Sequence, residues 1–265
     1  MLIAQISDTH VRPEGELYKG KVDSNARLAQ AVAHVNAIVP KVDLVLLTGD
    51  LVEMASDAEY AALRKLLKPL ACPVLVIPGN HDDRAVMRRA FADHDYLPVD
   101  GPMHYARGDL GPLRIVAVDI TVPGATHGEA DDASAEWLDQ ALAAEPERPT
   151  MVMMHQPPIV SSVPFLDGVR CRNGEKLEAV VARHKQVERI VCGHVHRFMQ
   201  ARFGGAMLVT APSTMSGFPL EMTGKEKPGW QVVPPACLVH HWRADVGLVT
   251  HYSPIGSFAG PFPFR

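Results

Sequence analysis

The segment MLIAQISDTH, residues 1–10, is a short apolar run that ends abruptly at Ser7 and Asp8, as a buried strand ends at a polar loop. An amphipathic helix is expected next, because apolar residues recur at helical spacing from the N-cap candidates Asp23 and Ser24 until Pro40. The same order of strand and helix then recurs along the chain. Further strands are expected at 43–48, 73–77, 150–154 and 187–192, and further helices at 56–67, 83–92, 133–144 and 174–184.

This alternation predicts a mostly parallel inner sheet with helices outside it. Other strands are expected in pairs, 103–107 with 113–119, and 198–203 with 206–210 around Gly204 and Gly205. Such hairpins imply a second sheet. Two more strands are expected at 236–242 and 246–252. The fold class is therefore α/β.

The composition is that of an ordinary folded globular chain. Of 265 residues, 47% are hydrophobic and 21% are charged, and 26 Lys and Arg against 30 Asp and Glu give a net charge of −4. Because there is no global basic field, neither large nucleic acid nor a membrane is expected as a partner. No apolar run approaches the roughly 18 to 20 residues of a membrane helix. The four cysteines are far apart and form no C-x-x-C pair, which favours reduced thiols and a cytoplasmic location.

Five of the expected strands end in residues that can bind a metal. Ligands collect at the carboxyl ends of strands in such folds, so these side chains are expected to converge. Asp8 and His10 are two residues apart, as are His194 and His196, and in an extended segment each pair would leave on one face. The converging set comprises Asp8, His10, Asp50, Asn80, His155, His194 and His196.

Carboxylates, imidazoles and one amide oxygen form a mixed nitrogen and oxygen donor set, which suits Mn, Fe, Zn or Co. Seven ligands exceed what one four-coordinate zinc accepts. Two ions that share one carboxylate would each receive four protein ligands from this set and keep open positions for water and substrate. The sequence therefore predicts two divalent or trivalent metal ions per chain.

The residues also resemble a known family. The ordered blocks are Asp8-Thr9-His10, Gly49-Asp50, Gly79-Asn80-His81-Asp82, His155 and Gly193-His194-Val195-His196. They resemble those of calcineurin-like metallophosphoesterases, and their spacing is most similar to that of the bacterial class III cyclic-nucleotide and glycerophosphodiester phosphodiesterases. The resemblance implies a four-layer α/β/β/α sandwich of two mixed sheets flanked by helices. It also implies two ligand sets, with Asp50 as the bridge: Asp8, His10, Asp50 and His196, and Asp50, Asn80, His155 and His194.

The activity implied by this resemblance is hydrolysis of small phosphodiesters, such as cyclic nucleotides and glycerophosphodiesters, by a metal-activated hydroxide that attacks phosphorus. Asp50, Asn80 and His81 are the expected catalytic residues. His81 would either stabilise charge on the phosphoryl group or protonate the leaving alkoxide. Three long loops, 12–21, 160–173 and 211–230, are expected to shape the leaving-group pocket.

Departures from related patterns narrow the class. The residues after Asp50 lack the Asp-Arg-Gly run of the protein serine/threonine phosphatases, and no tyrosine follows closely, as purple acid phosphatases require. The alternatives left open are a non-catalytic protein-binding scaffold on the same fold, and a broad phosphomonoesterase or nuclease. A scaffold need not keep any ligand, so the presence of the full set favours the hydrolase.

Residues 1–210 are expected to form the catalytic domain, and residues 211–265 a C-terminal extension that completes the fold. The aromatic stretch 258–264 is a candidate contact in a homo-oligomer, a dimer or higher, as related enzymes form. Asp82 and Asp83 are expected to cap the helix that follows, and the alternative for Asp82 is to orient a metal ligand that it contacts. Arg84, Arg88 and Arg89 are expected to form the solvated face of this helix. No role is assigned to the other histidines, namely His34, His94, His104, His127, His184, His240, His241 and His251.

Overall fold

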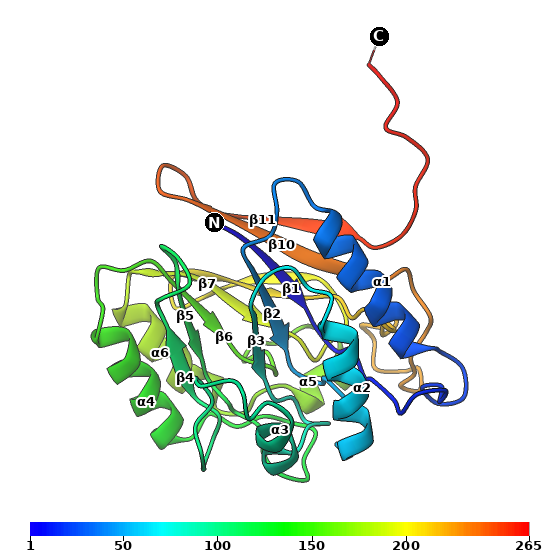
Figure 1. Cartoon of the computed structure of the whole chain (residues 1–265). Helices are drawn as coiled ribbons and strands as arrows, with labels where there is room; N and C mark the ends of the chain where they lie inside the picture. The colour runs from blue at the N-terminus through cyan, green and yellow to red at the C-terminus, as the bar shows by residue number, and fades with distance from the viewer. Residues whose placement is uncertain (265) are drawn as a thin grey trace.

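The computed structural model describes residues 1–264 and consists of two groups of strands and helices (Figure 1). The first group comprises β1 (Leu2–Ile6), α1 (Ser24–Ala37), β2 (Leu44–Thr48), α2 (Asp57–Leu67), β3 (Val74–Ile77), α3 (Arg84–Ala90), β10 (Ala236–Arg243) and β11 (Gly247–Pro254). The second comprises β4 (Tyr105–Arg107), β5 (Arg114–Ala117), α4 (Asp132–Ala143), β6 (Thr150–Met153), α5 (Pro164–Val169), α6 (Gly174–Arg183), β7 (Val187–Cys192), β8 (Met199–Phe203) and β9 (Ala206–Thr210).

Each group forms one mixed sheet, and the two sheets pack face to face. The strand orders are β11-β10-β1-β2-β3 and β4-β5-β6-β7-β9-β8. Helices α1, α2 and α3 cover the outer face of the first sheet, and α4 and α6 cover that of the second (Figure 1). The four-layer α/β/β/α sandwich is therefore confirmed. Among the helices of residues 1–264, none combines the length and apolar character needed to cross a membrane.

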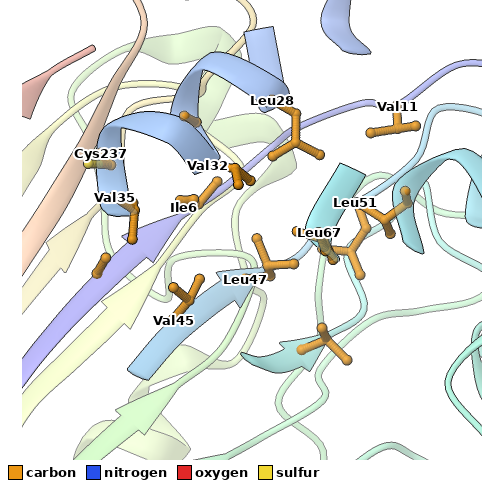
Figure 2. Close-up of a cluster of buried hydrophobic side chains, with 14 of the residues drawn as sticks. Ile6, Val11, Leu28, Val32, Val35, Val45, Leu47, Leu51, Leu67 and Cys237 are labelled. Carbon is orange, nitrogen blue, oxygen red and sulfur yellow. The ribbon is translucent and has the colours of Figure 1, made fainter. Parts of the chain in front are cut away.

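Alternation of side chains along buried strands explains the layers. Ile6 of β1 and Leu47 of β2 point toward the helices, and Figure 2 shows Ile6 beside Val32 of α1. Ile3 of β1 and Leu46 of β2 point the other way and pack against the second sheet. Both faces of these strands are apolar, which is the pattern of parallel strands covered on both sides.

The helix starts follow the capping residues. The Asp23 side chain accepts a hydrogen bond from the Ala26 amide at the start of α1. At the start of α2, Ser56 and Glu59 form the expected reciprocal capping box. One short helix, α5, occupies a segment for which a loop is expected. It begins at Pro164 without a side-chain cap, so the sequence carries no capping residue to mark its start.

Two expectations around α3 are wrong. Asp83 alone caps α3, whereas Asp82 turns back and accepts hydrogen bonds from the Gly79 and Leu51 amides. Arg84 is not a solvated side chain, because its guanidinium forms an ion pair with buried Asp119 at 2.6 Å. The contacts of Asp82 with Leu51 and of Arg84 with Asp119 join segments distant in sequence, which helix periodicity does not encode.

The strands that end at the expected site are divided between the sheets. Strands β1, β2 and β3 run parallel in the first sheet, and β6 and β7 run parallel in the second. An alternating pattern cannot distinguish this arrangement from a single inner sheet. Strand β10 also joins the first sheet, antiparallel to β1, with Ile3 opposite His240.

Candidate metal centre

The loops after β1, β2, β3, β6 and β7 bring the expected site residues together. Three groups of side chains each have donor atoms within 4.8 Å of one another. One is His10, Glu53 and His81, and the other two, called the donor groups below, both contain Asp50. Asn80 and His81 line the cavity next to them. The donor groups are Asp8, His10, Asp50 and His196, and Asp50, His155 and His194.

The two carboxylate oxygens of Asp50 face different groups. Its Oδ2 lies 3.7 Å from His10 Nε2, and its Oδ1 lies 3.3 Å from His155 Nε2. In the first group, His196 Nε2 is 3.4 Å from Asp8 Oδ1 and 3.2 Å from His10 Nε2. One carboxylate therefore stands between two separate sets of donors.

Three of the imidazoles are held by hydrogen bonds on their outer nitrogen. In each, Nδ1 has a partner outside the donor groups, so Nε2 faces the centre. Metal-binding histidines are usually oriented in this way, by a hydrogen bond on the ring nitrogen that does not bind the metal. The partners are Glu53 Oε2 for His10 (2.7 Å), the main-chain oxygen of Thr48 for His155 (2.7 Å) and Ser216 Oγ for His196 (3.0 Å).

Several buried polar atoms at the second group have no hydrogen-bond partner. They are Asn80 Oδ1, His155 Nε2 and both ring nitrogens of His194. Leaving such atoms buried and unpaired is costly. An amide oxygen and imidazole nitrogens beside a carboxylate are ligands for a borderline cation, so this donor set fits a metal ion.

The charges of the site's own side chains favour cation binding. Burial alone would raise the pKa of Asp50, but the charges of His155 and its other imidazole neighbours hold it well below its usual range. Burial would lower the pKa of His155, yet the Asp50 carboxylate outweighs it and raises that pKa to about 9. Burial and the charge of His155 lower the pKa of His194 to about 3. A cation therefore meets one ready imidazole and displaces one proton from the other.

The backbone is strained at these residues. Nine residues other than glycine have a positive φ in residues 1–264, and five of them belong to the expected set. These angles lie in the left-handed region, which is unfavourable and is concentrated at functional sites. The five are Asp8 (52°), His10 (42°), Asp50 (49°), His194 (69°) and His196 (48°). The expected extended segments are therefore wrong, although both members of each pair still reach the centre.

Glycines at three strand ends make room for the donors. A Cβ on Gly49 would overlap the His155 ring, and one on Gly79 would overlap the Asp50 carboxylate. A Cβ on Gly193 would lie 2.8 Å from Asp8 Oδ2, closer than such atoms approach. The small residue beside each donor is thus required by packing.

Glu53 belongs to the site although no pattern in the sequence analysis singled it out. Besides binding His10, its Oε2 lies 3.3 Å from His81 Nδ1. Burial alone would raise the pKa of Glu53, but the hydrogen bond from His10 and the positive imidazoles lower it, which keeps the carboxylate charged. Its place three residues after Asp50 is the only signal in the sequence, and its partner His10 lies far away in the chain.

A cavity of about 130 Å³ lies over the centre. Each of the three loops expected to shape the pocket contributes an aromatic ring to its wall: Tyr18, Phe165 and Phe218. His81 also faces this cavity, and its side chain is 32% exposed. The site can therefore admit a small molecule directly next to the donor groups.

Comparison with known proteins agrees with this geometry. The family model for calcineurin-like phosphoesterase matches residues 1–198. The chain belongs to the calcineurin-like phosphoesterase family. This phosphoesterase is 32% identical over 265 residues to a probable glycerophosphodiester phosphodiesterase (GpdQ) of Arcobacter nitrofigilis, covering 100% of this chain and 97% of that protein.

Another relative and one solved structure are also similar to the chain. The phosphoesterase is 31% identical to a 3',5'-cyclic adenosine monophosphate phosphodiesterase (CpdA) of Pseudomonas aeruginosa, over 82% of this chain and 78% of the other. Its fold matches that of a dimetal phosphatase from Danio rerio with a TM-score of 0.63, at 14% identity, over 97% of this chain and 99% of that one. The latter likeness concerns the fold alone.

Proposed function

We propose that this phosphoesterase hydrolyses small phosphodiesters with two metal ions held by the two donor groups. The observation that carries this proposal is the position of Asp50, whose two oxygens face separate sets of donors. When bound, two ions supply charge stabilisation of the phosphoryl group and lower the pKa of water toward ~7. The proposed ligands are Asp8, His10, Asp50 and His196 for one ion, and Asp50, Asn80, His155 and His194 for the other.

The relatives support a diester as the substrate. Those reported above are named for glycerophosphodiesters and for cyclic adenosine monophosphate, which are both small phosphodiesters. The mixed donor set suits Fe, Mn, Zn or Co. We therefore infer a diesterase specific for small molecules, with no role for large nucleic acid or for a membrane.

His81 is placed to act on the substrate. Its Nδ1 lies 2.9 Å from the main-chain oxygen of Glu53, so Nδ1 carries a proton and Nε2 is left for the cavity. Burial alone would lower the pKa of His81, but Asp50 and Glu53 outweigh it and raise that pKa. A protonated Nε2 can donate to a phosphoryl oxygen or to the leaving oxygen.

The test begins with protein stripped by a chelator and reloaded with Mn, Co, Zn or Fe. Metal content is measured together with hydrolysis of bis(p-nitrophenyl) phosphate and of p-nitrophenyl phosphate. We expect two ions per chain and metal-dependent turnover that favours the diester. Two bound ions without turnover of either ester would point to a binding scaffold, and a preference for the monoester would point to a phosphomonoesterase.

We also propose that the phosphoesterase is a cytoplasmic homo-oligomer. The four cysteines are unpaired, as in a reducing compartment.

After β11 the chain extends away from the body (Figure 1), and it carries three exposed rings, Phe258, Phe262 and Phe264. Exposed rings in an unpacked segment favour contact with a second copy. Light scattering should give a dimer or larger, and Phe258→Ser with Phe262→Ser should reduce the mass; a wild-type monomer would refute the proposal.

A further inference from the structure

Two phenylalanine rings stand beside the candidate metal centre on segments that supply none of its donors. Phe165 lies in the first turn of α5, and Phe218 lies in the loop between β9 and β10. Their ring centroids are 5.7 Å apart, with an interplanar angle of 65°. The Phe218 ring also lies against His196, with centroids 4.8 Å apart. The Phe165–Phe218 pair therefore adjoins the metal centre directly.

The position of Phe218 is fixed by its surroundings. The main-chain oxygen of Phe218 accepts a hydrogen bond of 2.6 Å from the Arg197 guanidinium. The preceding residue, Gly217, exchanges two main-chain hydrogen bonds of 2.9 Å with Gln231. Phe218 also packs on a small buried apolar cluster under α5. A ring that is already held in place loses little freedom when a ligand binds it.

The pair lines two adjoining spaces. One is the cavity over the metal centre, called the inner cavity below. The other, the outer space, has a volume of about 260 Å³, and Val163 and Gly229 are among the residues that line it. Tyr18 also lines the inner cavity, where its ring centroid lies 5.4 Å from that of His10 and its ring makes an edge contact with Trp230. Apart from the two donor groups and from Asn80 and His81, the residues that line the inner cavity are Tyr18, Thr126, Phe165, Leu166, Val169 and Phe218.

Such a wall fits a flat apolar group better than a polyol. Buried hydroxyl groups need hydrogen-bond partners, and only Tyr18 and Thr126 offer side-chain hydroxyls in this lining. Aromatic side chains, in contrast, stack on the face of any nucleobase. A substrate whose phosphate lies at the metal centre could extend along the pair toward the outer space.

We propose that the Phe165–Phe218 pair binds the planar ring of the substrate's ester group, so that phosphodiesters carrying a nucleobase are preferred over glycerophosphodiesters. This inference rests on the proposed diesterase function. It assigns a specificity role to two side chains that donate no ligand to the metals. Removing one stacking ring is expected to cost roughly five- to 150-fold in kcat/KM for a nucleobase substrate.

Aromatic faces also bind quaternary ammonium groups, as in a choline headgroup. Glu221 and Glu226 line the outer space together with Lys227, so the charge of this space does not by itself exclude a cation. The inner cavity adjoins the metal positions, where a further positive group would be repelled. A neutral ring therefore fits the inner cavity better than a cation, and the assay with glycerophosphocholine decides the question for the outer space.

The test compares Phe165→Ala, Phe218→Ala and the conservative Phe218→Tyr with wild type. Tyr252→Leu is the matched control, since Tyr252 is a half-exposed ring on β11 outside both spaces. Metal-loaded protein is assayed for kcat/KM with 3',5'-cyclic AMP, glycerophosphoethanolamine and glycerophosphocholine. The dissociation constants of the products AMP and glycerol 3-phosphate are measured by calorimetry, which does not depend on turnover.

We expect both alanine variants to lose cyclic AMP hydrolysis and AMP affinity by the factor above, while the two glycerol substrates change by less than about threefold. Phe218→Tyr and Tyr252→Leu should behave like wild type. Equal losses on all substrates, or losses confined to glycerophosphocholine, would overturn the inference. If wild type hydrolyses no diester, the proposed function fails by itself, and the AMP affinities of the variants still decide whether the pair binds a ring.

Discussion

Glu53→Gln should weaken metal binding without removing a metal ligand. The Glu53 carboxylate accepts the His10 Nδ1 proton at 2.7 Å, and its side chain is only 11% exposed. A glutamine oxygen can still accept this proton, but the charge that strengthens the bond and makes His10 a better donor to metal is lost. Replacing Glu53 by glutamine thus isolates the effect of its charge.

The expected loss follows from two independent estimates. A hydrogen bond to a charged group contributes about 1.5–3 kcal/mol, which corresponds to roughly 10- to 150-fold in affinity. Removing the partner of a metal-binding histidine costs about 10- to 100-fold. We therefore expect Glu53→Gln to raise the dissociation constant of one ion by about 10-fold, and Glu53→Ala by up to about 100-fold.

The assay is calorimetric titration of chelator-stripped protein with Zn²⁺ or Mn²⁺ in competition with a chelator. Glu147→Gln, an exposed residue between α4 and β6, controls for the change in net charge. Only one of the two sites should weaken, because Glu53 contacts His10 but none of the second donor group. Unchanged affinity at both sites, with the melting temperature of the stripped protein also unchanged, would refute the reasoning.

Three further predictions follow from the same geometry. Asp50→Ala should impair both metal sites, whereas His81→Ala should slow turnover by about 10²–10⁴-fold with metal content nearly intact; metal analysis and kcat separate the two. Gly79→Ala should lower metal content, because its Cβ displaces the Asp50 carboxylate. Burial lowers the pKa of His240 to about 3, so the unfolded chain binds more protons below its own pKa of about 6.5. The contribution of His240 to the free energy of unfolding should therefore be fully present above pH ~6.5 and fall by up to about 1.4 kcal/mol per pH unit below it. Urea unfolding at two pH values should show a smaller fall for His240→Gln.

Much of the fold and of the candidate site could be predicted from the sequence, because both depend on local patterns. Each apolar run that stops at a polar residue marks a strand and its end, as Leu44–Thr48 followed by Gly49-Asp50 does. The capping box at Ser56 fixes where α2 begins. The donor types are visible letter by letter, and their order along the chain carries the family resemblance.

Other features exist only once distant segments meet. The division of five strands between two sheets depends on pairings such as β1 with β10, which join residues more than 230 positions apart. The positive φ angles of Asp8 and His194 are imposed by contacts across the centre, where the Asp8 carboxylate accepts the His194 amide at 2.9 Å. Aspartate and histidine adopt a positive φ less readily than glycine does, so the residue types alone do not predict this conformation.

The sequence by itself determined which residues can bind metal and that they follow strands. The tertiary structure decided that Asp50 turns one oxygen toward each donor group, that Glu53 holds His10, and that the Phe165–Phe218 pair forms one wall of the cavity. The physical reason is that apolar periodicity and turn residues act over a few positions, whereas distances and orientations between side chains are set by the packing of two sheets against each other.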